Sequence, residues 1–171
     1  RVGDVGAPDR DLAALDAQTG ALTSFQADAN APVTSLAYSP ATDKVFVGGR
    51  FTTIGGQSYY GLASVHPTTG DVLPLPANST IRNAGTTAAI LDLNVLGDKV
   101  YGTGYRYGDG GNVEGVFKLD APTGAVEWVA DCHGDGYSSF TANGVVYLVT
   151  HEHYCGNMGG FPQTDPWTIH Y

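Results

Sequence analysis

The sequence predicts an all-β protein of about three β-propeller-like blades, each built from four antiparallel strands. The main observation is a nine-residue phrase ending in Thr-Gly that occurs at residues 12–20, 62–70 and 116–124. Its spacings of 50 and 54 residues match the length of a propeller blade rather than that of a helical solenoid repeat. The chain also holds 24 glycines among 171 residues, with no collagen-like period, which fits a protein full of tight turns.

Two strand-like runs joined by a turn follow each copy of the phrase. The runs are short and rich in β-branched or aromatic residues, and turn formers such as Asn143 and Gly144 separate them. We therefore expect three hairpins, made by residues 33–38 with 44–49, 90–95 with 99–104, and 137–141 with 145–150.

The phrase itself is expected to form a further hairpin, with its Thr-Gly at the turn, where glycine supplies a left-handed conformation. Residues 9–18 alone would favour a helix, because they combine an N-cap candidate with good helix formers. The third copy has strand character, however, and equivalent positions of a repeat share one structure. The repeat therefore favours strands at residues 12–15, 62–65 and 116–119, followed by partner strands at 21–25, 71–75 and 125–129.

The phrase also predicts the organisation of the chain. Residues 1–171 are expected to form a single β-propeller piece with units of approximately 11–60, 61–114 and 115–171. Residues 1–10 would end a preceding blade, and residues 167–171 would open another strand. Closed propellers usually need about four to eight blades. We therefore expect a piece of a longer polypeptide, or a domain that other chains complete.

Charge and hydropathy exclude some classes of partner. The chain has 8 Lys and Arg against 17 Asp and Glu, which gives a net charge of −9. This balance, with no basic cluster, argues against nucleic acid or an anionic membrane as a partner. No apolar run approaches 18 residues, so we expect no membrane insertion.

The two cysteines are expected to form a disulfide. If Asn143 and Gly144 make a two-residue turn, counting outward along the hairpin places Cys132 opposite Cys155. Strict counting puts them in the wider, hydrogen-bonded type of pair, and a bulge near Gly134 or Gly136 would correct this. Free thiols and metal ligands are the alternatives. A structural disulfide indicates an oxidising compartment, so we expect a protein that is secreted or displayed on the cell surface.

Residues 45–57 read Val-Phe-Val-Gly-Gly-Arg-Phe-Thr-Thr-Ile-Gly-Gly-Gln, and Gly-Leu-Ala-Ser-Val at 61–65 and Thr-Gly at 69–70 follow them. This pattern resembles the repeat of secreted bacterial β-propellers of the delta-60-repeat-like type, which are common in large actinobacterial surface proteins. The resemblance covers nearly the whole chain and is strongest over residues 11–70. It implies an extracellular propeller accompanied by adhesive or carbohydrate-binding modules, and it implies no catalytic residues. Residues 101–107 and 150–155 depart from the pattern.

The densest polar cluster lies around the two cysteines. In the hairpin register Gly134 faces His153 and Gly136 faces His151, and His133 would join these two imidazoles from the facing strand. Three imidazoles would make an open zinc site. The alternative is a strand end pinned by the disulfide, whose histidines form local hydrogen bonds or line the propeller mouth.

Carboxylates supply two further hypotheses. Asp135 would face Glu152, and a close carboxylate pair is the arrangement of retaining glycosidases. Asp109, Asn112 and Glu114 offer three oxygen ligands on a glycine-rich loop that would suit calcium, although their spacing differs from that of an EF-hand. An ordinary pair of solvated charges and an ordinary glycine-rich turn are the respective alternatives.

Tyrosines would supply an aromatic binding face. Tyr105, Tyr107 and Tyr154, with residues 59–60, fall in loops or strand ends where rings stack on sugars, although tyrosine is also a common strand residue. With Asp135 and Glu152, they are the candidate ligand-binding residues.

The leading functional hypothesis is a non-catalytic extracellular propeller module with a structural, adhesive, glycan-binding or protein-binding role in a larger surface protein. Its partners would be the remaining blades or domains of the same polypeptide and a carbohydrate or protein ligand, with no cofactor required beyond calcium or zinc as alternatives. The rival is an extracellular hydrolase or metalloenzyme with its site at His133, His151 and His153. A multi-chain fibre or shell is a third hypothesis. The sequence does not identify the ligand.

Overall fold

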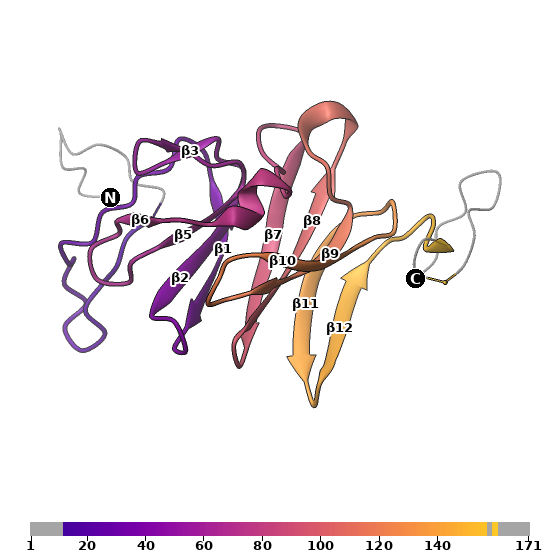
Figure 1. The fold of residues 1–171 in the computed structure, drawn as a ribbon. Coiled ribbons are helices and arrows are strands. Elements are labelled where there is room, and N and C mark those ends of the chain that lie inside the picture. The colour runs from indigo at the N-terminus through magenta and orange to yellow at the C-terminus, as the bar shows by residue number, and fades with distance from the viewer. Residues whose placement is uncertain (1–11, 157–158, 161–171) are drawn as a thin grey trace.

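The computed structural model describes residues 12–156 and 159–160, and in this part of the chain the protein is all-β with two short 3₁₀ helices, Pro76–Ser79 and Gly108–Gly110 (Figure 1). The predicted end of a preceding blade at residues 1–10 and the predicted strand at 167–171 lie outside the described residues.

Two four-stranded antiparallel sheets form the body of the protein, and in both of them each strand pairs with the next strand of the sheet along the chain (Figure 1). The first sheet has the order β1-β2-β5-β6, and the second has the order β7-β8-β9-β10. The bounds in the first sheet are Val33–Ser39, Lys44–Gly49, Leu62–Val65 and Val72–Leu73. Those in the second are Ala88–Leu96, Lys99–Arg106, Gly115–Asp120 and Val126–Asp131.

Two hairpins complete the described structure. Strands β3 (Thr53–Ile54) and β4 (Gln57–Ser58) form a small hairpin between β2 and β5. Strands β11 (Gly136–Ala142) and β12 (Val145–Thr150) form a longer hairpin after the second sheet. The three hairpins predicted from the strand-like runs are thus confirmed as β1–β2, β7–β8 and β11–β12.

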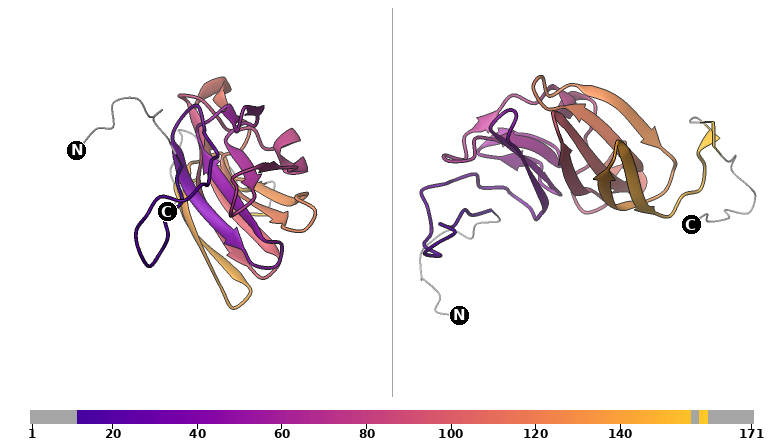
Figure 2. Two further views of the ribbon diagram at one scale, coloured as in Figure 1. Left: turned by 90° about the vertical axis from the view of Figure 1, so that its left-hand side faces the viewer. Right: turned by 90° about the horizontal axis from the view of Figure 1, so that it is seen from below.

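The sheets stand side by side through their first strands. Strand β7 contacts β1 on one side and β11 on the other, and Figure 2 shows the sheets following one another along an arc. Side chains join neighbouring sheets: the Thr34 hydroxyl donates to the Ile90 carbonyl at 2.5 Å, and the Asn94 amide donates to the Ser139 carbonyl at 2.6 Å. The described sheets do not close into a ring.

All three copies of the Thr-Gly phrase fold into the same turn. In each copy the N–H of the glycine donates to the carbonyl four residues earlier, at 2.8–2.9 Å, and the glycine has a positive φ (Gly20, Gly70 and Gly124). The second copy makes the β5–β6 turn and the third makes the β9–β10 turn. Each four-stranded sheet therefore begins with a hairpin from one predicted unit and ends with the phrase of the next, and the division into units stays a prediction.

The first copy differs from the other two. Residues 12–15 and 21–25, which we expected to be strands, form only an isolated bridge between Leu15 and Leu22, and they form no helix either. In the complete sheets, β5 and β9 also pair with a central strand on their other side. Residues 12–15 have no such central strand among the described residues, which explains the missing regularity.

The core fills the spaces between the sheets. Successive side chains of β2 point to opposite faces, so Phe46 joins the cluster shared with the second sheet and Val47 joins the cluster that contains Leu12 and Phe25. A side chain at Gly102 would collide with the ring of Phe117, since an added Cβ would lie 2.2 Å from it. Glycine at this position of β8 thus makes room for the buried ring of Phe117.

A fully buried asparagine ties the β8–β9 loop to the segment between the two sheets. The Asn83 amide donates to the carbonyls of Tyr105 and Val113, at 3.0 and 2.6 Å. Its carbonyl oxygen accepts the N–H groups of Asn112 and Val113, both at 3.0 Å. Three of these four backbone groups belong to the loop and the fourth, the Tyr105 carbonyl, lies near the end of β8, so this one side chain fixes the loop's position.

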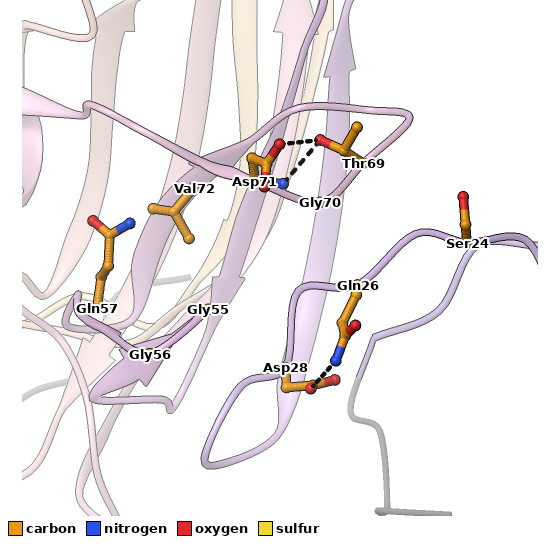
Figure 3. Close-up of a pocket in the computed structure, with 10 residues that line it drawn as sticks. All are labelled: Ser24, Gln26, Asp28, Gly55, Gly56, Gln57, Thr69, Gly70, Asp71 and Val72. Carbon is orange, nitrogen blue, oxygen red and sulfur yellow. Dashed lines mark hydrogen bonds between the residues drawn. The ribbon is translucent and has the colours of Figure 1, made fainter.

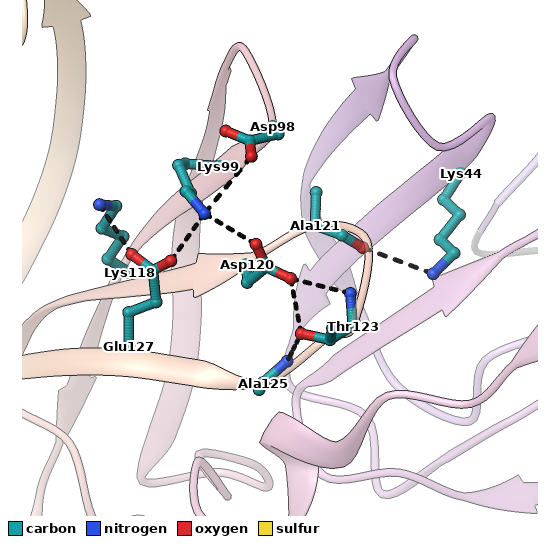
Figure 4. Close-up of polar contacts among 9 residues, drawn as sticks. All are labelled: Lys44, Asp98, Lys99, Lys118, Asp120, Ala121, Thr123, Ala125 and Glu127. Atoms are coloured by element: carbon teal, nitrogen blue, oxygen red, sulfur yellow. Dashed lines mark hydrogen bonds and ion pairs between the residues drawn. The ribbon is translucent and has the colours of Figure 1, made fainter.

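A chain of ion pairs crosses the exposed surface of the second sheet (Figure 4). Lys99 lies 2.7 Å from both Asp120 and Glu127, and Lys118 lies 2.7 Å from Glu127. The hydrogen bond to Asp120 is the main reason that the pKa of Lys99 is raised, and the same bond lowers the pKa of Asp120. These side chains are partly exposed, so solvent screens the interactions.

Candidate functional site

A polar cleft lies where the second sheet meets the β11–β12 hairpin. Because neighbouring strands are antiparallel, the ends of β8, β10 and β12 and the starts of β9 and β11 all meet at one edge. The cleft has a volume of about 560 Å³. We call it the histidine cleft and define it by its lining residues Arg106, Tyr107, Glu114, His133, Gly134, Asp135, His151 and His153.

A disulfide joins Cys132, the neighbour of the cleft residue His133, to Cys155, as predicted. Backbone hydrogen bonds reinforce it: the Cys132 N–H donates to the Glu114 carbonyl at 3.0 Å, and the Cys132 carbonyl accepts the Tyr154 N–H at 3.0 Å. Glu114 is thereby tied to the segment that carries His133. The disulfide excludes both sulfurs as metal ligands.

The register that we expected around the disulfide is wrong in detail. A bulge at Tyr137 shifts the pairing, so that Gly136 faces Thr150 instead of His151. The bulge lies next to Gly136, one of the two glycines near which the sequence predicts a bulge. Gly134 lies against the backbone of His151 and Glu152 rather than facing His153.

The same shift separates the expected pair of carboxylates. Asp135 accepts the N–H of His151 at 3.1 Å through its backbone carbonyl, and its carboxylate lies 3.8 Å from Nδ1 of the same histidine. The carboxylate of Glu152 instead lies 3.2 Å from Sγ of Cys155. Asp135 therefore faces His151, not Glu152, and the structure does not build the predicted close pair.

Neighbouring rings fix the three histidines. The Nδ1 atom of His151 lies 2.6 Å from the Tyr137 hydroxyl, and the rings of His151 and His153 meet edge to face at 5.4 Å. His133 has a positive φ of 50° and its ring lies 5.7 Å from that of Tyr154. All three imidazoles line the cleft. Among the described residues, however, the ring nitrogens of the three histidines do not form a set that lies within 4.8 Å of one another.

A different set of ligand atoms does come together. Glu114, Asp131 and His133 each offer one atom within 4.8 Å of the other two. Burial raises the pKa of the Glu114 carboxyl, and the charges of Asp131 and Asp135 add to this effect, whereas Arg106 and His133 oppose it. The cleft therefore concentrates negative charge that a cation would neutralise. Sequence reasoning missed Arg106, since nothing in its spacing distinguishes it, and it placed Asp131 in the polar cluster without giving it a role as a ligand.

The three predicted calcium ligands lie in two places. Asp109 and Asn112 line a separate hollow with Arg82, while Glu114 lines the histidine cleft. The Asn112 side chain is already occupied, because its oxygen accepts the Arg82 N–H at 2.8 Å and its amide donates to the Thr80 carbonyl. The structure does not gather these three side chains around one point.

The candidate tyrosines have three different environments. Tyr107 is 81% exposed and lines the histidine cleft. Tyr105 lies under the guanidinium of Arg50, at 5.4 Å, and Tyr154 packs against His133. Only Tyr107 of these three both lines the histidine cleft and presents most of its surface to solvent.

A larger hollow of about 640 Å³ lies between residues 24–28, the β3–β4 turn and the second Thr-Gly turn (Figure 3). Its polar side chains bond mainly to one another: Gln26 donates to Asp28 at 3.1 Å, and Thr69 donates to Asp71 at 2.7 Å. It contains no aromatic or cationic lining residue, so the histidine cleft is the better candidate for binding.

No protein-family model matches the chain, and neither a curated protein nor a solved structure similar to it was found. No helix formed by the described residues is long and apolar enough to span a membrane.

Proposed function

We propose that the chain is a non-catalytic extracellular module of the β-propeller type, and that it binds a carbohydrate in the histidine cleft. Three features support the proposal. Meandering four-stranded sheets stand next to one another through their first strands, as propeller blades do. The disulfide is typical of oxidising compartments. The resemblance to secreted actinobacterial propellers of the delta-60-repeat-like type agrees with both, and so does a role in adhesion within a larger surface assembly.

The observation that carries the proposal is the exposed ring of Tyr107 beside fixed polar groups. An amphipathic ring at the rim of a cleft stacks on the apolar face of a sugar at little cost in side-chain entropy. Behind it, Arg106 offers donors and Glu114 and Asp135 offer acceptors, in reach of the same cleft. Sugar hydroxyls both donate and accept hydrogen bonds, so a sugar site needs acceptors as well as donors. The cleft supplies both near the ends of paired strands.

Binding to an array of polysaccharides and oligosaccharides tests this function. The disulfide-bonded chain should bind at least one glycan, and Tyr107→Ala should weaken that binding about tenfold, which is about 1.4 kcal/mol. Tyr38→Ala is the matched control, since Tyr38 is also largely exposed but lies on β1, away from the cleft. Binding that Tyr107→Ala leaves unchanged, or a chain that binds no glycan, would contradict the proposal.

Cation binding is a second candidate function, favoured by the cluster of Glu114, Asp131 and His133. One imidazole and two carboxylates suit zinc or manganese, and three protein ligands leave coordination positions open for water or substrate, as in the rival metalloenzyme hypothesis. Isothermal titration with zinc should show one site that His133→Ala weakens at least tenfold. His66→Ala is the control, because His66 caps the β5–β6 turn instead. A titration without saturable heat would exclude this candidate.

A further inference from the structure

The two ends of the described chain each carry one hairpin of the kind that makes half of a four-stranded sheet: residues 12–25 at the first end and β11–β12 at the other. At the first end, the Leu15–Leu22 bridge occupies the same place in its phrase as Val65–Val72 and Leu119–Val126 in the two complete sheets. Val65 and Leu119 are fully buried, whereas Leu15 is 62% exposed. The difference follows from pairing: Val65 lies beside Val45 of β2, and Leu119 beside Val100 of β8.

At the other end, β12 lacks the second neighbouring strand that β2 and β8 have among the described residues. It is the second strand of a hairpin, as β2 and β8 are, and its first paired residue, Val145, corresponds to Lys44 and Lys99. Strands β2 and β8 pair on both sides, but among the described residues β12 pairs only with β11. Its apolar side chains are consequently exposed: Val149 is 62% exposed, while Thr103, at the equivalent position of β8, is fully buried.

We propose that the residue 12–25 hairpin of a second copy of this chain pairs with the free edge of β12. The pairing would complete a four-stranded sheet made of β11, β12 and the two arms of that hairpin. Both complete sheets use one register between these elements, with Val45 opposite Val65 and Val100 opposite Leu119. By the same register, Val146 would face Leu15, and Val149 would face Leu12 of the other copy.

The occupant follows from what covers the same strand elsewhere in this molecule. In both complete sheets, the element beside the central strand is a Thr-Gly hairpin. Among the described residues, only the first Thr-Gly hairpin has no central strand beside it. Its Leu12 and Phe25 are buried against the first sheet, so the hairpin is anchored on its own chain while Leu15 faces outward. Joining the two ends would also continue the side-by-side packing that links β1, β7 and β11.

Such a contact is heterologous, because it joins different surfaces of the two copies, and it is a form of strand addition. It goes beyond the proposed binding function and does not depend on it. Two copies joined reciprocally would form a closed ring, and a contact that does not close would form an open chain of copies.

Sedimentation velocity on the 171-residue chain over a range of concentrations tests the proposal. The wild type should self-associate, and Leu15→Asp and Val149→Asp should each be monomeric, because each spoils one half of the contact. Both side chains are largely exposed in the single chain, so both variants should retain the wild-type far-ultraviolet circular dichroism. Leu96→Asp, at a partly exposed site outside both halves, should associate as the wild type does.

The decisive measurement mixes the two monomeric variants. The Leu15→Asp variant keeps an intact β12, and the Val149→Asp variant keeps an intact hairpin, so the mixture should form a one-to-one heterodimer through a single good contact. Native mass spectrometry on isotopically labelled partners would identify this species. A wild type that stays monomeric at the highest concentration, or a mixture that forms no heterodimer, would overturn the proposal.

Discussion

Replacing Asn83 with alanine should be among the most destabilising single changes in the protein. The side chain is fully buried and bonds to four backbone groups, three in the β8–β9 loop and one near the end of β8. An alanine leaves all four without this partner. A buried group that loses its hydrogen bond costs about 1–3 kcal/mol, whereas a group that reaches water costs much less.

The expected magnitude follows from which partners are buried. The N–H and carbonyl of Val113 belong to a residue that is only 2% exposed, so they cannot turn to water. The groups of Tyr105 and Asn112 lie nearer to the surface. Two fully buried groups at the middle of the range give a loss of roughly 4 kcal/mol in the free energy of unfolding.

Urea unfolding followed by tryptophan fluorescence and circular dichroism measures this loss. Gln18→Ala, at an exposed turn position, is the control and should change stability by less than about 0.5 kcal/mol. Asn83→Asp keeps the acceptor but places a second oxygen against two carbonyls, so its deficit should shrink at low pH, where a protonated carboxyl can donate. A loss below about 1 kcal/mol for Asn83→Ala would refute the reasoning, because the loop would then not depend on this side chain.

Two further predictions concern the disulfide and the surface ion pairs. Replacing Cys132 and Cys155 together with alanine opens a loop with a sequence separation of 23 and should lower the free energy of unfolding by about 3 kcal/mol in the chain-entropy model. A reducing agent should reproduce this loss in the wild type and should not affect the double variant; a wild type that is insensitive to reduction would contradict it. The lowered pKa of Asp120 adds stability that is present above about pH 4, its unfolded value, and is lost as the pH falls through the folded value. Asp120→Asn should therefore flatten the decline in urea midpoint between pH 7 and pH 2, and an unchanged decline would assign the acid sensitivity to other carboxylates.

The sequence was most informative where the period-two pattern and turn chemistry agree. The strands around Asp43, Gly97 and Asn143 follow from apolar alternation and from residues that tolerate a positive φ, and the structure has all three turns. The disulfide was predictable because counting along the hairpin brings the two cysteines close together, although the bulge changes the exact register. Propensity alone did not decide between helix and strand at residues 12–15, because a regular strand there needs a neighbouring strand to pair with.

The location of the site could be predicted from the sequence, but the arrangement of its side chains could not. Counting along a hairpin indicates that a bulge is needed but not which residue forms it, and the bulge at Tyr137 moved Asp135 from Glu152 to His151. Arg106 enters the cleft from β8, which is distant in sequence from the histidines, so no local spacing reveals it. Asn83 carried no signal either, since a buried asparagine looks like a loop residue until its four partners are known.

The row formed by β1, β7 and β11 has a consequence for how the protein opens. The first sheet contacts the second, and the second contacts the β11–β12 hairpin, so stability passes along the row between nearest neighbours, as in a one-dimensional array. The second sheet is held from both sides and should exchange its amide hydrogens last. The first Thr-Gly hairpin and the tip of β11–β12 are each held from one side, so unfolding should begin at the two ends and travel inward.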